Sequence, residues 1–187
     1  MAMETIKYAS EIVKELHRSV ERIVEEEAET LADIILQSNK VFVAGAGRSG
    51  LMGRAFAMRL MHTGINAYVV GETITPGIGK DDVLIIGTGS GETRSLIPMA
   101  QKAKGLGASV VAVTIAPESA IGSLADALVK LPGSPKDQAS GGHTTIQPMA
   151  SLFEQTLLVF YDAVILRMMD KTGLDSDRMY GRHANLE

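Results

Sequence analysis

The most informative segment of the chain is Val83-Leu84-Ile85-Ile86-Gly87-Thr88-Gly89-Ser90-Gly91-Glu92-Thr93. Its apolar start is long enough for one buried strand, glycines then alternate with hydroxyl side chains, and a helical pattern follows. Glycines let backbone N–H groups point inward without a Cβ clash, and hydroxyls add donors. The start of a helix adds free N–H groups and a positive dipole end. This strand, turn and helix predict a site for a small dianion, most simply a phosphoryl group.

Short apolar strands and helices alternate on both sides of this stretch. Strands are expected at 41–44, 67–70, 83–86, 109–114 and 127–131, with helices at 51–61, 93–104 and 121–125 between them. Strands that are apolar throughout and separated by helices are typical of a parallel sheet that is covered on both faces. The sequence therefore predicts an α/β fold, a three-layer α/β/α sandwich with a five-stranded parallel sheet.

Helical segments are expected at both ends of this alternation. Residues 3–38 follow an amphipathic pattern of one or two helices, and residues 148–170 form a helix that is apolar nearly all round. Between sheet and final helix, residues 132–147 are polar and rich in Pro and Gly, as in a functional or disordered loop. No linker divides the chain, so residues 1–187 are expected to form a single domain. The amphipathic 3–38 segment needs a packing partner, and another subunit is a good candidate.

The composition excludes several classes of protein. The 187 residues carry a net charge of −4, with 45% hydrophobic and 21% charged residues, so a globular protein is expected and nothing favours nucleic acid or a membrane surface. The absence of cysteine excludes disulfides, thiolate nucleophiles and cysteine-ligated zinc, and the four histidines lack metal-ligand spacing. Neither a signal peptide nor a membrane span is evident, so a cytoplasmic protein is expected.

A second glycine-rich turn follows the first strand. Residues 45–50, Gly-Ala-Gly-Arg-Ser-Gly, satisfy GxGxxG, and Glu72 lies where a ribose-binding acid is expected, so a dinucleotide site is one interpretation. Arg48 weakens the dinucleotide interpretation, because it places a bulky side chain in the turn where the pyrophosphate must approach the backbone closely. Simple tight turns, and helix capping by Ser90 and Thr93, are further alternatives. Parallel strands end at one edge of a sheet, so the two turns together favour a pocket for a phosphorylated polyol.

Glu154 is the most informative carboxylate. In a helix that starts at Pro148, an apolar stripe would surround Glu154, and desolvation there would make it a stronger general base. The alternative is structural, because Ser151 to Glu154 matches the capping-box pattern, although Pro148 suits the first helical position. Both interpretations remain open. His183 lies in a polar tail, where a histidine is usually just solvated.

The two glycine-rich motifs, 44–50 and 87–93, resemble those of the sugar isomerase (SIS) domain family, a flavodoxin-like fold that binds phosphosugars with the second motif. More closely, the chain resembles the 6-phospho-3-hexuloisomerase branch of that family. The resemblance runs nearly end to end, and the other segments that carry it are 56–62, 71–76, 132–138, 146–149, 151–156 and 183–187. Thr88 stands where many SIS proteins have serine, and threonine retains the hydroxyl.

This resemblance implies an enzyme of the ribulose monophosphate pathway that interconverts D-arabino-hex-3-ulose 6-phosphate and fructose 6-phosphate through a 2,3-enediolate. It implies that Glu154 is the base and that Arg48 stabilises the enediolate or orients the substrate. It also implies that His183 assists ring opening or proton shuttling, in its own or a neighbouring subunit. The phosphate-binding residues that it implies are Ser49, Thr88, Ser90, Gly91 and Thr93.

The resemblance implies neither a metal nor an organic cofactor, because protein groups can stabilise an enediolate. The expected partners are a phosphosugar and further copies of the chain, as in the tetramers common among small SIS proteins or as a dimer. Another SIS phosphosugar isomerase and a non-catalytic phosphosugar sensor are the alternative functions. SIS regulators typically carry a DNA-binding segment before the domain, whereas residues 1–40 here form a short and acidic segment.

Overall fold

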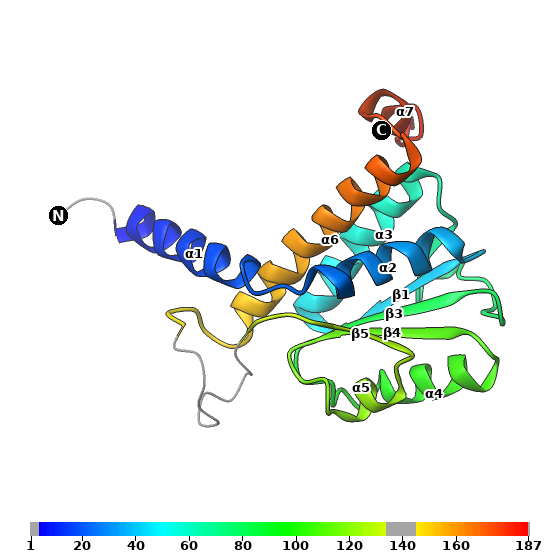
Figure 1. The fold of residues 1–187 in the computed structure, drawn as a ribbon, viewed down its shortest axis with the longest axis horizontal. Coiled ribbons are helices and arrows are strands. Elements are labelled where there is room, and N and C mark those ends of the chain that lie inside the picture. The colour runs from blue at the N-terminus through cyan, green and yellow to red at the C-terminus, as the bar shows by residue number, and fades with distance from the viewer. Residues whose placement is uncertain (1–3, 134–144, 187) are drawn as a thin grey trace.

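A five-stranded parallel sheet forms the centre of the molecule, in a computed structural model that describes residues 4–133 and 145–186 (Figure 1). Its strands lie in the order β2-β1-β3-β4-β5, and every neighbouring pair is parallel. The strands are β1 (Val41–Gly45), β2 (Ala67–Val69), β3 (Val83–Thr88), β4 (Ser109–Thr114) and β5 (Ala127–Lys130). All five predicted strands are confirmed, because uninterrupted apolar runs suit strands buried on both faces.

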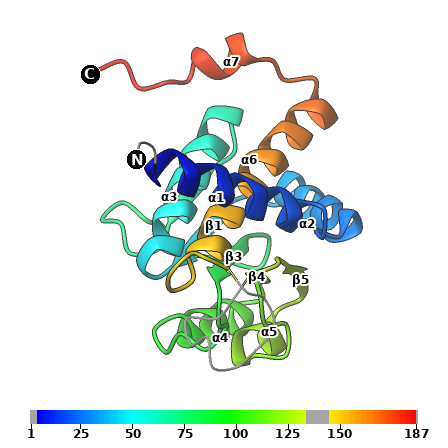
Figure 2. The ribbon, with the colours of Figure 1, turned by 90° about the vertical axis from the view of Figure 1, so that its left-hand side faces the viewer.

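Helices cover both faces of the sheet, so the predicted three-layer sandwich is confirmed. One face carries α2 (Glu25–Gln37), α3 (Gly47–Thr63) and α6 (Ser151–Thr172), and the other carries α4 (Ile97–Gly105) and α5 (Ala120–Leu124) (Figure 1). The N-terminal α1 (Glu4–Val20) packs on α6, outside the sheet layer. Beyond the end of α6, the short α7 (Ser176–Tyr180) lies far from α4 and α5 (Figure 2).

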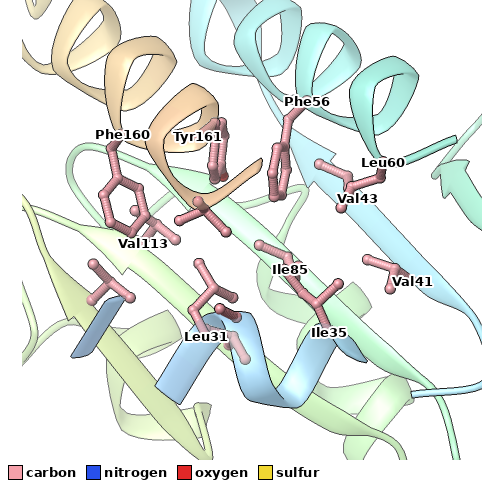
Figure 3. Close-up of a cluster of buried hydrophobic side chains, with 14 of the residues drawn as sticks. Leu31, Ile35, Val41, Val43, Phe56, Leu60, Ile85, Val113, Phe160 and Tyr161 are labelled. Carbon is pink, nitrogen blue, oxygen red and sulfur yellow. The ribbon is translucent and has the colours of Figure 1, made fainter. Parts of the chain in front are cut away.

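Successive residues of a strand point to opposite faces of the sheet, so they pack into two separate hydrophobic cores. Val43 and Ile85 face the first core, where they pack with side chains from α2, α3 and α6 (Figure 3). There the rings of Phe56 and Tyr161 stack with centroids 4.1 Å apart. Ile86 faces the second core, under α4 and α5. Each large side chain that is fully buried stabilises the fold by about 1.5–3 kcal/mol.

The helical ends differ from the sequence predictions in detail. The 3–38 segment forms two helices, and α6 begins three residues after Pro148. The polar tail contains α7, for which no helix was predicted, and its N-cap Asp175 accepts a hydrogen bond from the Arg178 backbone N–H. Part of the predicted 132–147 loop lies outside the described residues. Within 4–133 and 145–186, no helix combines the length and apolarity that a membrane span requires.

The strand order creates a crevice at one edge of the sheet. β1 connects to β2 on one side, whereas β3 connects to β4 on the other, so the chain leaves the carboxyl ends of β1 and β3 in opposite directions. Ligands in open α/β sheets bind at such switch points. Glycine lets α3 start directly over β1, because a Cβ on Gly50 would lie 2.7 Å from the carbonyl oxygen of Gly45. The fold therefore brings the two glycine-rich turns to one place.

Candidate active site

A cavity of about 390 Å³ lies at this switch point. Its walls come from the residues at the start of α3, the turn after β3, Ile115 and the beginning of α6. Six of the predicted site residues line it: Arg48, Ser49, Thr88, Ser90, Thr93 and Glu154. The structure thus brings together residues from three distant parts of the sequence.

Internal hydrogen bonds hold the turn after β3 in shape. The Thr88 Oγ1 accepts from the Gly91 N–H at 3.2 Å and lies 3.4 Å from the Thr93 Oγ1. Ser90 Oγ accepts from the Glu92 N–H at 3.2 Å. Gly91 is buried beneath the turn with a φ of +66°, and a Cβ there would lie 1.8 Å from the Ser119 Oγ. Gly91 therefore shapes the turn, and its neighbours Thr88, Ser90 and Thr93 line the cavity.

Capping does not explain these hydroxyls. Helix α4 begins at Ile97, four residues later than predicted, and its N-cap Leu96 has no side-chain cap. The N-terminus that lines the cavity belongs instead to α3, whose N-cap Ala46 also has no side-chain cap. The start of a helix combines unsatisfied N–H groups with a positive dipole end, which suits a phosphoryl group. A helix N-terminus therefore lines the cavity, but it is that of α3 rather than that of the helix after β3.

Glu154 is buried in the first turn of α6 and meets a cation there. Its Oε2 lies 2.9 Å from the Arg48 Nη1, which also donates to the Ser151 Oγ at 3.0 Å. The Glu154 side chain is 9% exposed and that of Arg48 is 51% exposed. The N-cap of α6 is Ala150, without a side-chain cap, so the capping-box interpretation is wrong. The expectation of purely apolar surroundings was incomplete, because Arg48 comes from a turn about a hundred residues earlier.

His183 lies at the opposite end of α3 from the cavity. Its ring stacks on that of His62, with centroids 5.4 Å apart, near the C-terminus of α3. Burial, Arg59 and His183 lower the pKa of His62. A rise of 1.5 Å per residue puts His62 about 20 Å from Arg48 along the helix. His183 therefore does not line the cavity of its own chain.

The structure does not support Glu72 as the ribose-binding acid of a dinucleotide site. Glu72 forms an ion pair with Arg54 of α3 and is not among the residues that line the cavity. Ser151 and Ile115 contribute to the site although no motif in the sequence singles them out for a function. The only signal for Ser151 was its capping-box spacing to Glu154, which pointed to a structural role.

Comparison with known proteins identifies the class to which this arrangement belongs. Residues 34–166 match the SIS domain, and the chain belongs to the SIS family. Within that family it is 60% identical over 185 residues to the 3-hexulose-6-phosphate isomerase of Bacillus subtilis (strain 168), covering 99% of this chain and 100% of the relative. It is 44% identical to the 3-hexulose-6-phosphate isomerase of Mycobacterium gastri, covering 87% of this chain and 81% of that protein.

A solved structure agrees with these relatives. A crystal structure from Methanococcus jannaschii, which inferred a molecular function of 3-hexulose-6-phosphate isomerase, superimposes with a TM-score of 0.80 at 35% identity. The alignment covers 99% of this chain and 100% of that one. The fold and most of the chain, including the helices outside the matched SIS segment, are therefore shared with isomerase relatives.

Proposed function

We propose that this protein is a 3-hexulose-6-phosphate isomerase, which interconverts D-arabino-hex-3-ulose 6-phosphate and fructose 6-phosphate in the ribulose monophosphate pathway. The observation that carries the proposal is a single cavity lined both by the hydroxyl-rich 88–93 turn and by the buried carboxylate of Glu154. One part of such a cavity suits a phosphate and the other suits proton transfer next to a carbonyl. The names of the 60% and 44% identical relatives supply the choice of sugar.

Glu154 acts as the general base. It takes the proton from C2 of the hexulose, the electron pair forms the C2–C3 double bond, and the C3 carbonyl pair moves to O3 to give a 2,3-enediolate. The hydroxyl proton of O2 then passes to O3, and Glu154 returns its proton to C3 as the carbonyl forms at C2. In the unliganded site the carboxylate is paired with Arg48 at 2.9 Å. The Arg48 side chain is half exposed, so water can solvate the guanidinium when it leaves Glu154. Arg48 is therefore free to turn from Glu154 to the enediolate oxygen as negative charge moves from the carboxylate to the substrate.

The phosphate binds at the turn after β3 and at the start of α3. Hydroxyls of Thr88, Ser90 and Thr93 and the nearby Ser49 supply donors, and Gly91 keeps the turn in its shape. Anchoring the phosphate fixes the C2 and C3 hydrogens relative to Glu154, and this positioning lowers the barrier by several kcal/mol.

His183 assists ring opening or proton shuttling in the site of a neighbouring subunit. Its distance from the cavity of its own chain supports an origin across a subunit boundary, because α3 separates the two. Exposed apolar side chains on α1, such as Ile6 and Val13 at 57% and 65% exposure, support an assembly. A tetramer is favoured over a dimer, and the substrate pathway favours the cytoplasm.

Hydrogen exchange from fructose 6-phosphate in D₂O, followed by NMR, tests the reaction. The isomerase should incorporate deuterium at C3, because the reverse reaction removes that hydrogen. Exchange at C1 would indicate an isomerase that interconverts an aldose and a ketose. Binding without exchange at either carbon would indicate the phosphosugar sensor instead.

A further inference from the structure

Helix α1 buries a carboxylate where an apolar side chain would be less costly. Glu15 is 4% exposed, whereas Val13 on the same helix is 65% exposed. Burying a charged group is unfavourable unless it is paired and hydrogen-bonded. The burial of Glu15 therefore indicates a specific set of partners.

Those partners are three successive residues of the segment that leads into α6. Glu15 accepts hydrogen bonds from the Thr145 Oγ1 at 2.6 Å, the Ile146 N–H at 2.9 Å and the Gln147 Nε2 at 2.9 Å. Burial raises the pKa of Glu15, but these three hydrogen bonds and the charge of Arg18 outweigh it, so the pKa lies below its ordinary value. The carboxylate thus holds 145–147 against α1.

The held segment determines where α6 begins. Met149 follows with a φ of 60°, the only positive φ among the non-glycine residues of 4–133 and 145–186. Such a conformation costs about 1–3 kcal/mol and persists only where the surrounding structure fixes it. Ala150, the next residue, lines the cavity and is the N-cap of α6. Glu154 lies one turn further on. The chain therefore runs from the Glu15 contacts to the carboxylate of the site within seven residues.

We propose that Glu15 is a positioning residue for the reaction: it holds residues 145–147 so that the first turn of α6 presents Glu154 and Ser151 to Arg48 and the substrate. The proposal rests on the proposed function of the site. Helix α1 lies against α6 (Figures 1 and 2), but it lies outside the matched SIS segment 34–166. Glu15 thus links the catalytic carboxylate to a helix that the shared SIS domain does not include.

Glu15→Gln is the direct test, since it keeps the size of the side chain but replaces one of the two accepting oxygens with an amide N–H₂ and removes the charge. A misplacement of the base should lower kcat by about 10- to 100-fold. KM and the Kd for fructose 6-phosphate should change little, because the phosphate side of the cavity is lined by the 88–93 turn and the start of α3, whereas Glu15 holds residues 145–147. The matched control is Glu11→Gln on the same helix, which removes only the exposed pairs with Lys14 and Arg18 and should retain the wild-type kcat.

A charge-swapped double variant separates positioning from general destabilisation. Glu15→Gln with Gln147→Glu restores an amide–carboxylate contact in the opposite direction and should recover most of the lost kcat. A wild-type kcat in Glu15→Gln would overturn the proposal. So would a parallel loss of kcat, substrate affinity and unfolding temperature that the swap does not rescue.

Amide hydrogen exchange tests the inference without substrate. Amides of residues 145–154 should exchange faster in Glu15→Gln than in the wild type, and unchanged exchange there would overturn the role of Glu15. A wild-type protein without C3 exchange would overturn the isomerase function instead. The two failures are therefore distinguishable.

Discussion

Replacing Glu154 with glutamine should separate catalysis from folding. The amide keeps the size of the side chain but cannot accept the C2 proton, and a general base typically contributes about 10²- to 10⁴-fold to the rate. At 1.36 kcal/mol per factor of ten, this corresponds to about 3–5 kcal/mol of the barrier. The glutamine amide oxygen can still accept a hydrogen bond from Arg48, whose side chain is 51% exposed, so the unfolding temperature should fall only slightly. Arg48 also keeps its hydrogen bond to Ser151 at 3.0 Å.

The assay follows C3 hydrogen exchange of fructose 6-phosphate by NMR, together with calorimetric binding and thermal unfolding. Glu154→Gln should bind the phosphosugar and unfold near the wild-type temperature while exchange is lost. Glu29→Gln is the matched control, since it breaks another carboxylate–arginine pair, with Arg167, away from the cavity. Exchange retained within about threefold of the wild type, below the smallest usual general-base effect, would refute the assignment of Glu154.

Three further predictions concern stability. Gly91→Ala should destabilise the fold by at least about 2 kcal/mol in urea unfolding, because the φ of Gly91 is +66° and the new Cβ would meet Ser119. Gly105→Ala, with open space around it, is the control, and equal urea midpoints for the two variants would disprove the clash. Arg167 and Lys171 lower the pKa of Glu29 to about 2 from 4.5, so their stabilisation is complete above pH 4.5 and is lost as the pH falls toward 2. Glu29→Gln should flatten the fall of the unfolding temperature across that window, and an unchanged slope would contradict the pairing. Among residues 4–133 and 145–186, the buried hydroxyl of Tyr161 has no hydrogen-bond partner, so Tyr161→Phe should leave stability unchanged or raise it by about 1 kcal/mol. A clear decrease in the unfolding temperature would indicate a bond to the hydroxyl.

The sheet could be predicted from sequence because its signal is local. Strands such as Val83–Thr88 are buried along their whole length, so an uninterrupted apolar run marks each one. The position of the site followed from the same pattern, since glycine-rich turns end neighbouring strands at one edge of the sheet. Arg48, Thr88 and Glu154 line the cavity, as predicted. Arg48 and Thr88 could be selected because they are polar residues in turns at the ends of strands, and Glu154 because it is a carboxylate in an apolar helix.

Features that depend on distant contacts could not be predicted. Glu15 is buried because it meets Thr145, 130 residues further along the chain, and no pattern within α1 signals that contact. The start of α6 was placed at Pro148 because proline suits a first helical position, whereas the strained Met149 delays the helix. His183 was grouped with the site by resemblance, and only the path of the chain shows that α3 separates the two.

The cavity takes its two kinds of functional group from segments that can change independently. The phosphate side is part of the sheet scaffold, where a Cβ on Gly50 or Gly91 would clash with neighbouring atoms. The carbonyl side belongs to a late segment, residues 145–154, which contacts the scaffold through Arg48 and α1 through Glu15, whereas the later turns of α6 pack in the first core. Substitutions in the late segment can therefore alter which sugar reacts while the phosphate anchor is inherited unchanged. This division offers a physical route by which one scaffold diversifies its substrates without evolving a new fold.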